Sequence, residues 1–464
     1  MDRYLRLLPL VILLLLPGCA HFRVNEPMPQ YVVRPLPVPV SRAGDLLVVL
    51  TFSGGGARAS ALSYGVLQEL ADTEIVWNGR KRRLLDEVDM ISAVSGGSFP
   101  AAYYALFGDR IFTDFEPAFL RRNVDGELVK RLFYPTNWFR LATPYYNRSE
   151  LAEDYYNRIL FKGATFADID LQTAPEILIN ATDITLGDGF SFDRSHFDLI
   201  CSRLDSFPIS RAVTASSAVP GIFSAMTIRN YAGSCDYKVP RWVSDVLRSP
   251  SKADNRLYLA RKIAAYDNTG QRPYIHLLDG GLADNLGLRA LIDRVKLHHR
   301  TPDGTVKGAL LGLDLKKILV VVVNAAAAPD TSLNLVDHPP SIATTVDIAT
   351  TVQVNRYNDE TLRVFQENLE EWQQSIRVLR CGSEHCKKEP DFYLVDASLM
   401  RLDDRDEREF LQHLPTSFSL DDSAVDRLIA AGRGLLQNSQ RMQQFLRSVR
   451  VPEKSGGKQS ASSR

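Results

Sequence analysis

The chain has 464 residues and carries 55 Lys and Arg against 55 Asp and Glu, so its formal net charge is zero. A hydrophobic fraction of 45% and a charged fraction of 24% are ordinary for a globular protein, and the length suffices for one large domain with additions or for two to three smaller ones. The charge balance argues against nucleic acid as a partner, and we expect the one dense basic cluster, 79–83 (GRKRR), in a solvated loop.

The N-terminus is typical of an exported protein. Arg3 and Arg6 precede an apolar run over 7–16, which is too short for a membrane-spanning helix but suits a secretory signal. The following residues, 16–19 (LPGC), resemble a bacterial lipobox, in which the cysteine becomes the lipidated first residue, although Pro17 is unusual there. We expect a lipoprotein signal peptide over 1–18 and a lipid anchor at Cys19; the alternative is an ordinary signal peptide.

Export also fits the residues that follow. Ala20 in place of an aspartate predicts an outer-membrane lipoprotein of a Gram-negative bacterium facing the periplasm, or more broadly a protein of the cell envelope. Residues 19–44 are predicted to be the anchor and a proline-rich, extended tether. The remaining cysteines allow the pairs Cys201–Cys235 and Cys381–Cys386, with four free thiols as the alternative.

Alternating strands and helices are predicted along the rest of the chain. Apolar runs at 45–52 and 88–94 each end in a glycine- or serine-containing turn and lead into a helical pattern, which is typical of an α/β sheet covered on both faces. Further strands are expected at 175–184, 274–281 and 317–326, and a helix from Ser149. The catalytic domain is predicted over 45–328, a mainly helical region packed on it over 329–450, with Ser419 and Asp422 capping its last helix, and a disordered tail over 451–464.

Ser95 follows the second strand within 91–100 (ISAVSGGSFP). Small neighbours at Ala93 and Gly97 suit a sharp strand-to-helix turn that exposes a nucleophilic hydroxyl at a helix N-terminus. The alternative is a polar loop.

A run of glycines, Gly54, Gly55 and Gly56, follows the first strand. Its backbone N–H groups are suited to a phosphate or to the oxyanion of a tetrahedral intermediate. A dinucleotide site would need an acidic residue at the end of the second strand, where this chain has Ser95.

Asp279 ends a predicted strand and precedes two glycines, so its carboxylate is expected at the same sheet edge as Ser95, where it could act as a general base. The alternative is an aspartate that caps a turn. Among the histidines, His276 should face the opposite side of the strand from Asp279, and His338 is the first to test as a third member of the site.

Together these motifs resemble the patatin-like phospholipase family. They are GGGAR at 54–58, A-x-S-x-G at 93–97, ASSAVPGIF at 215–223 and DGG at 279–281. The resemblance implies a three-layer α/β/α fold with a mostly parallel central sheet, and a Ser–Asp dyad without histidine. By position it makes Ser95 the nucleophile, Asp279 the base, and Gly54, Gly55 and Gly56 the oxyanion hole, with Arg58 as a supporting basic residue. Ala93 and Ala59 depart from the family's pattern, each standing where a glycine is usual.

The expected function is therefore a membrane-anchored serine lipid acyl hydrolase of the phospholipase or lysophospholipase type, with membrane lipid as substrate. The alternatives are an esterase or acyltransferase on other acyl esters, or a non-catalytic lipid- or partner-binding lipoprotein. No cofactor and no metal site is expected, because no Cys or His spacing typical of a metal site occurs. The aromatic-rich stretch 131–147 is either a lipid-facing lid or a set of buried core residues.

Overall fold

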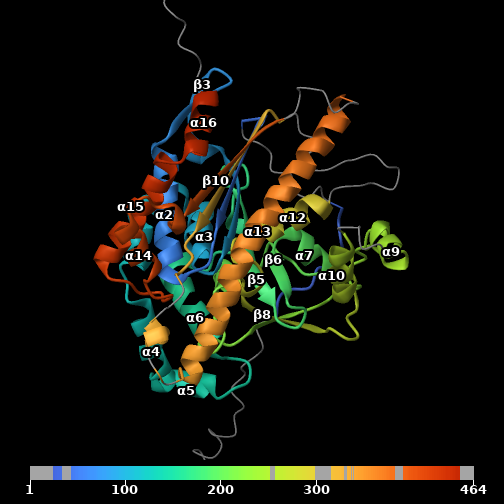
Figure 1. Ribbon diagram of the computed structural model, residues 1–464. Helices are drawn as coiled ribbons and strands as arrows, with labels where there is room; N and C mark the ends of the chain where they lie inside the picture. The colour runs from blue at the N-terminus through green and yellow to red at the C-terminus, as the bar shows by residue number, and fades with distance from the viewer. Residues whose placement is uncertain are drawn as a thin grey trace, which may run out of the picture.

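The computed structural model describes residues 24–33, 43–250, 256–297, 315–328, 332–335, 337, 339–381 and 390–449 (Figure 1). The predicted signal peptide, Cys19, Cys386, His338 and the C-terminal tail lie outside these ranges. None of the helices in the described ranges is long and apolar enough to cross a membrane.

The strands lie mainly where the apolar runs predicted them, with additional short strands between. They are β1 Leu46–Phe52, β2 Glu74–Trp77, β3 Arg80–Arg83, β4 Val88–Val94, β5 Glu176–Asp183, β6 Asp188–Phe192, β7 Met226–Arg229, β8 Tyr274–Asp279, β9 Lys317–Asn324 and β10 Asp391–Ser398.

The α-helices alternate with these strands and then dominate the C-terminal part. They are α2 Gly56–Asp72, α3 Ser98–Phe107, α4 Val124–Leu132, α5 Pro135–Leu141, α6 Arg148–Tyr156, α7 Arg194–Leu199, α8 Ile209–Ser216, α9 Arg241–Arg248, α10 Leu257–Asp267, α11 Gly281–Asp284, α12 Leu288–Leu297, α13 Ile342–Cys381, α14 Arg405–Gln412, α15 Asp422–Gln437 and α16 Gln440–Val449.

The central sheet has the strand order β10-β9-β1-β4-β5-β8-β7, with β6 also pairing with β5. The strands from β10 to β5 are parallel, whereas β6, β8 and β7 join in antiparallel pairs. Since β10 comes from the region expected to be mainly helical, that region adds an edge strand to the sheet as well as covering it.

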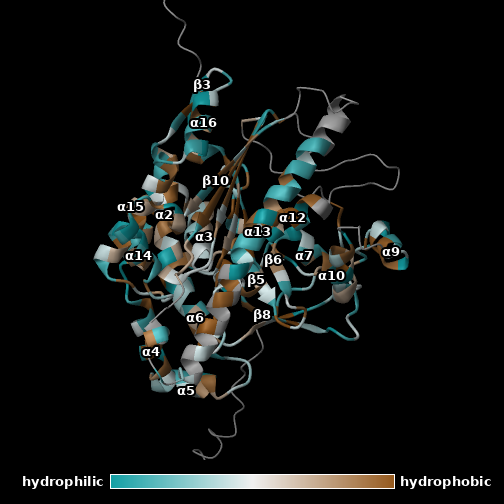
Figure 2. Cartoon of the chain, in the orientation of Figure 1, coloured by the Kyte–Doolittle hydropathy of each residue, from teal (hydrophilic) through white to brown (hydrophobic). Residues whose placement is uncertain are grey.

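Helices cover both faces of the sheet, and the alternation of side chains along β1 shows why. Leu46, Val48 and Leu50 belong to the hydrophobic core shared with α2, α3 and α15, whereas Leu47 and Val49 belong to the core shared with α12 and α13. Figure 2 shows the apolar strands between helices whose outward sides are polar. The expected three-layer α/β/α arrangement with a mostly parallel sheet is confirmed.

Two glycines let the C-terminal helix α15 pack closely on α2. A Cβ on Gly65 would collide with the backbone of Ile429, and a Cβ on Gly432 would collide with the backbone of Leu62. The C-terminal region is therefore joined to the first βα unit by direct backbone contact.

Part of the predicted tether, Val24–Tyr31, packs against the catalytic domain. The Asn25 side chain bonds Ser202 and the backbone of Arg229, and the Tyr31 amide donates to the Cys235 carbonyl oxygen at 2.6 Å. Cys201 and Cys235 form a disulfide, one of the two pairings that the cysteine count allows, with Cα atoms 5.5 Å apart. The extended segment thus lies on the chain beside a covalent cross-link.

Two local predictions were wrong. The basic cluster 79–83 is not a loop: β3 pairs antiparallel with β2, and Lys81 forms an ion pair with Glu74. Helix α15 is capped by Asp421, whose carboxylate accepts from the Ala424 amide at 2.9 Å, and not by Ser419. Both errors occur in runs of polar residues. In such a run the sequence alone does not show whether the chain forms a loop or a hairpin strand, or which residue caps a helix.

Candidate active site

Ser95 lies in a strained turn between β4 and α3. Its φ of 49° is in the left-handed region, which a residue with a side chain rarely adopts. The next two glycines permit the turn, because a Cβ on Gly96 would collide with the Gly56 carbonyl oxygen and one on Gly97 with Phe52. Ala93, in contrast, is an ordinary buried strand residue, so its departure from the family's glycine does not affect the turn.

Asp279 reaches Ser95 by a route that the sequence did not indicate. Strand β8 is antiparallel to β5 and pairs Asp279 with Ala181, so β8 approaches the sheet from beyond the carboxyl edge of the parallel strands and ends there. The Ser95 hydroxyl donates to Asp279 Oδ2 at 2.7 Å, and the Gly281 amide donates to Oδ1 at 2.8 Å. Burial raises the pKa of the Asp279 carboxyl to about 6, against the lowering effect of these two hydrogen bonds.

The segment 215–223 positions both residues. The Ser95 amide donates to Ser216 Oγ at 2.8 Å, and Ser216 Oγ in turn donates to the Asn180 carbonyl oxygen at 2.6 Å. The Asp279 amide donates to the Ala218 carbonyl oxygen at 3.0 Å. The last residue of α8 and the turn that follows the helix therefore hold the backbone of the serine and of the aspartate.

The glycine run forms the wall next to Ser95. Gly54 lies so close that a Cβ there would be 3.2 Å from Ser95 Cβ, while Gly55 and Gly56 have φ values of 134° and 59°. The Gly54 amide donates to the Asn285 carbonyl oxygen at 3.1 Å and the Ala57 amide to the Ser417 carbonyl oxygen at 2.7 Å. Gly55 and Gly56 lie between Gly54 and Ala57, and their amides do not donate to these two carbonyl oxygens.

Arg58 is buried and joins the glycine run to the C-terminal region. Its Nε donates to the Ala325 carbonyl oxygen at 2.8 Å, and its terminal nitrogens contact the Leu414 carbonyl oxygen and Thr416 Oγ1. Burial lowers the pKa of the guanidinium to about 10, so it stays protonated at neutral pH. Ala59 is an ordinary helical residue, and the left-handed backbone needed here lies at Gly55 and Gly56 instead.

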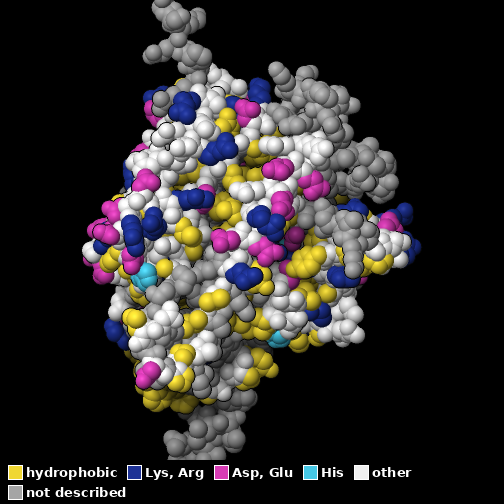
Figure 3. All heavy atoms as spheres, in the orientation of Figure 1, with side chains coloured by type: hydrophobic (Ala, Val, Ile, Leu, Met, Phe, Trp, Pro, Cys, Tyr) yellow, Lys and Arg dark blue, Asp and Glu magenta, His cyan; other side chains and the backbone are white. Residues whose placement is uncertain are grey.

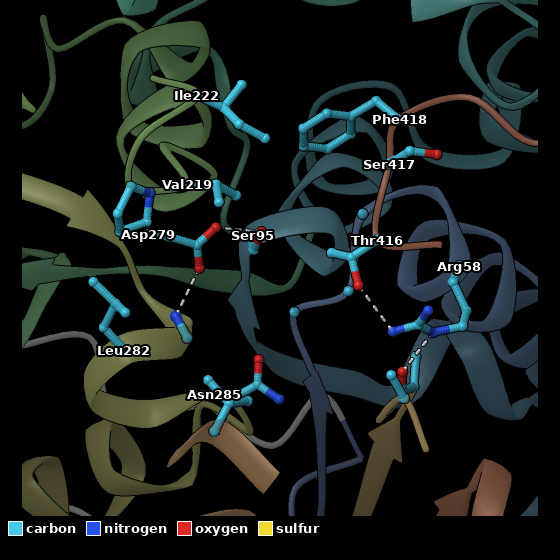
Figure 4. A pocket seen from close by; sticks show the side chains of 18 of the residues that line it. Arg58, Ser95, Val219, Ile222, Asp279, Leu282, Asn285, Thr416, Ser417 and Phe418 are labelled. Carbon is cyan, nitrogen blue, oxygen red and sulfur yellow. Dashed lines mark hydrogen bonds between the residues drawn. The ribbon is translucent and has the colours of Figure 1, made fainter. Parts of the chain in front are cut away.

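A cavity of about 230 Å³ opens over Ser95 and Asp279 (Figure 4). Its apolar side chains come from the segment after α8, from the turn after Asp279 and from the segment before α15; they include Val219, Ile222, Phe223, Leu282 and Phe418. A cavity that places one hydroxyl and one carboxyl among apolar groups suits an acyl chain near its ester.

Several residues of the cavity were not predicted from the sequence. Thr416, Ser417 and Phe418 lie more than 100 residues after the last predicted motif, in a segment without periodicity, and only the tertiary packing brings them to the site. Asn285 follows DGG by a few residues, and its side chain lies against Gly54 and Gly281. In the sequence, its position shortly after Asp279 is the feature that connects it with the site.

Histidine takes no part in the described lining of the cavity. The ring of His276 bonds Thr227 Oγ1 at 2.9 Å, away from Ser95. Among the described residues, no group of three or more His, Cys, Asp or Glu is arranged to hold a metal ion.

An α/β fold with a serine at a strained strand-to-helix turn, hydrogen-bonded to a buried aspartate beside a glycine run, defines a hydrolase-like class of protein. The model of the family described as patatin-like phospholipase matches residues 50–292, which is more than half of the chain. The chain belongs to this family.

Two solved structures are similar to this chain at low sequence identity. Human GIVD cytosolic phospholipase A2 is 12% identical, with 88% of this chain and 62% of that chain covered and a TM-score of 0.43. VipD from Legionella pneumophila is 9% identical, with 92% and 71% covered and a TM-score of 0.33. The chain thus spans less than two thirds of the length of the human enzyme, and no curated protein sequence matches it.

Proposed function

We propose that this chain is a serine lipid acyl hydrolase of the phospholipase or lysophospholipase type, which works through a Ser95–Asp279 dyad. The observation that carries the proposal is the 2.7 Å hydrogen bond from the Ser95 hydroxyl to Asp279 Oδ2 inside a largely apolar cavity. Burial supports the role of base, since it brings the pKa of the carboxyl to about 6, close to the working range of a general base.

In the first half-reaction, Ser95 Oγ attacks the carbonyl carbon of the ester while its proton passes to Asp279 Oδ2. The tetrahedral intermediate then expels the alcohol, which takes the proton from Asp279, and an acyl-Ser95 ester remains. In the second half-reaction, Asp279 takes a proton from water, the resulting hydroxide attacks the acyl carbon, and Ser95 leaves with the proton returned to it.

The oxyanion of both intermediates is assigned to the amides of Gly55 and Gly56. Gly54 was expected to contribute as well, but its amide donates to the Asn285 carbonyl oxygen, so its contribution is to let the backbone approach Ser95. The buried cation of Arg58 is close to Gly55, where a Cβ would be 3.5 Å from one guanidinium nitrogen. It therefore adds a fixed positive charge behind the glycine run.

The cellular location of the enzyme is proposed from the signal-like sequence at the N-terminus. A lipid anchor at Cys19 would hold the enzyme on the periplasmic side of the outer membrane, with membrane lipid as substrate and no cofactor. The apolar lining supports an acyl chain in the cavity but does not distinguish head groups.

Labelling with a fluorophosphonate probe tests the nucleophile. The wild-type chain should be labelled, Ser95→Ala should not be, and Asp279→Asn should be labelled at least about 100-fold more slowly because the base is lost. Ser244→Ala, on α9, is the matched control and should be labelled like the wild type. Equal labelling of Ser95→Ala would overturn the assignment, and no labelling of a folded wild type would favour a non-catalytic lipid-binding role.

Profiling the products then addresses the substrate. With wild-type enzyme and phospholipid vesicles, free fatty acid and a lysophospholipid or glycerophosphodiester should appear. Cleavage of short-chain esters alone, or transfer of the acyl group to an added alcohol, would favour the esterase or acyltransferase alternative.

A further inference from the structure

Five aromatic side chains around α5 form an exposed apolar surface, which we call the aromatic surface: Phe133, Tyr134, Trp138, Phe139 and Tyr145. Phe139 is 79% exposed, Phe133 69% and Trp138 56%. The expectation that the aromatics of 131–147 might be core residues is wrong for all of them except Tyr146. Exposed aromatic residues gathered in this way usually mark an interaction site.

Helix α5 itself has no buried residue. A helix of seven residues gains little from its own hydrogen bonds, and in proteins such helices are normally stabilised by packing an apolar side on a core. The Trp138 indole donates to the Leu132 carbonyl oxygen at 3.0 Å, which fixes the ring without covering it. Within the described chain, Leu141 of α5 packs partly on the core, whereas Trp138 and Phe139 remain exposed.

The segment that carries the aromatic surface is cationic in sequence, and carboxylates outside the segment pair with some of its cations. Between 129 and 148 the sequence has four cationic side chains and no carboxylate, although the whole chain is neutral. Two of the cations are attached locally: Lys130 to Glu127 at 2.8 Å, and Arg140 to Asp154 at 3.0 Å while its guanidinium stacks on Tyr146. Aromatic residues mixed with Lys and Arg are typical of segments that lie in the interface of an anionic membrane.

Helix α4 connects the aromatic surface to the lining of the cavity. The helix begins at Val124, and the following residue Asp125 lines the cavity. On the other side of the cavity Ile222 is 60% exposed. Figure 3 shows hydrophobic side chains gathered at the end of the molecule where Figure 1 places α5.

The N-terminal segment lies at the same end of the sheet. Strand β8 runs antiparallel to β5, so its first residue, Tyr274, lies farther out than Asp279 past the carboxyl ends of the parallel strands. Tyr274 pairs with Arg229 of β7, and the Arg229 amide donates to Asn25 Oδ1 at 2.7 Å. Cys19 precedes Val24 by five residues, which can span about 18 Å at most. An anchor at Cys19 would thus bring this end of the molecule to the membrane.

We propose that the aromatic surface inserts into the interface of an anionic phospholipid bilayer and sets the cavity against the lipid. The purpose of the contact rests on the proposed lipid hydrolysis, but the contact can be measured without it. The occupant inferred is the bilayer because the cations, the uncovered aromatics, the cavity entrance and the short N-terminal reach all belong to one end of the molecule.

Tryptophan fluorescence of the full-length protein on vesicles that contain phosphatidylglycerol and brominated phosphatidylcholine tests the contact. Of the four tryptophans, Trp77 and Trp372 are buried and Trp242 is half-buried with the Arg256 guanidinium over its ring, so the most lipid-accessible emission should come from Trp138, which is the exposed one. We expect quenching in the wild type and about a tenfold smaller quenched fraction in Trp138→Tyr. If the vesicle-bound wild type is not quenched, or if Trp138→Tyr is quenched equally, the proposal is overturned and a protein partner becomes the better occupant. Equal quenching on purely neutral vesicles would overturn the preference for anionic lipid.

A second pair of variants links the surface to turnover. Phe133→Ser with Phe139→Ser should lower hydrolysis of vesicle lipid about tenfold and leave hydrolysis of a water-soluble short-chain ester unchanged. Tyr258→Ser, on α10 and with a similarly exposed ring, is the control and should change neither rate. An equal loss of activity on both substrates would show that these side chains stabilise the catalytic site and do not act by contacting the bilayer. If the wild type cleaves neither substrate, the proposed function fails, while the quenching measurement still decides the contact.

Discussion

At the scale of single residues, Ser95 and Asp279 show how one site uses both strain and desolvation. The left-handed φ of 49° sets the Ser95 hydroxyl apart from the strand, and the burial of Asp279 makes its carboxyl a stronger base than a free aspartate. The sequence predicted both residues, because a strand end followed by glycines indicates such a turn. It singled out the segment 215–223 but assigned no role to Ser216, whose hydroxyl joins the Ser95 amide to the Asn180 carbonyl oxygen, because this contact exists only in the folded chain.

The first prediction at this scale concerns the pH profile. Asp279 accepts a proton only as the carboxylate, and its pKa is about 6, so kcat/KM for a substrate that does not titrate should fall about tenfold per pH unit below that value. Stopped assays from pH 4.5 to 8 on a soluble ester measure it, with unfolding followed in parallel. A flat profile in enzyme that stays folded would contradict the role of Asp279 as base.

A second prediction concerns stability. Because the pKa of Asp279 is higher in the folded chain than the ordinary value of 3.8, the folded state favours the protonated form, and the stability gained is lost as the pH rises through about 6. Asp279→Asn removes the buried charge and should raise the free energy of unfolding at pH 8 by up to about 3 kcal/mol, with little difference at pH 4. Denaturant titrations at the two pH values test this; an equal effect at both would point to packing and not charge.

At the scale of elements, the glycine run and the segment before α15 depend on each other. Gly56 is held against Ser417, and Arg58 bonds the Leu414 carbonyl oxygen and Thr416 Oγ1. The strands and the first two βα units could be predicted from apolar runs and glycines, since those signals are local. The edge strand β10 could not, because Asp391 to Ser398 carries polar and apolar residues that acquire a partner only when β9 lies beside them.

The third prediction uses this contact. Gly56→Ala needs a φ near 59° and puts a Cβ into the Ser417 backbone, so the oxyanion wall should shift and kcat/KM should fall by at least about 100-fold. The matched control is Gly187→Ala, whose φ of 67° is equally unfavourable but whose Cβ would meet open space. The control should lower stability by about 1 kcal/mol and keep its activity. Similar activities for the two variants would mean that the wall tolerates displacement.

At the scale of the whole molecule, the N-terminal segment, the cavity and the aromatic surface share one end of the sheet. The segment over 24–31, taken as a tether in the sequence, is held by hydrogen bonds from Met28 to Cys201 and from Tyr31 to Cys235. A proline-rich composition predicts extended backbone correctly, but it does not reveal that the extended chain finds acceptors on its own domain.

A fourth prediction concerns the disulfide, because Cys201 and Cys235 each accept one of these hydrogen bonds. The double variant Cys201→Ser with Cys235→Ser should lose about 2–4 kcal/mol of stability, since the bridge closes a loop with a sequence separation of 34. It should also expose the N-terminal segment to protease, which limited proteolysis under native conditions would detect. Cleavage at equal rates in the variant and the wild type would show that the segment is held without the bridge.

The contact between Gly56 and Ser417 has a consequence for the order of events during biosynthesis. The serine, the aspartate and the glycine run are all complete once residue 281 has been made, yet the wall of the cavity waits for residues 414–418 near the end of the chain. A nascent or truncated chain that holds every motif therefore has no finished site. The complete site therefore exists only once synthesis has reached the last helices of the chain.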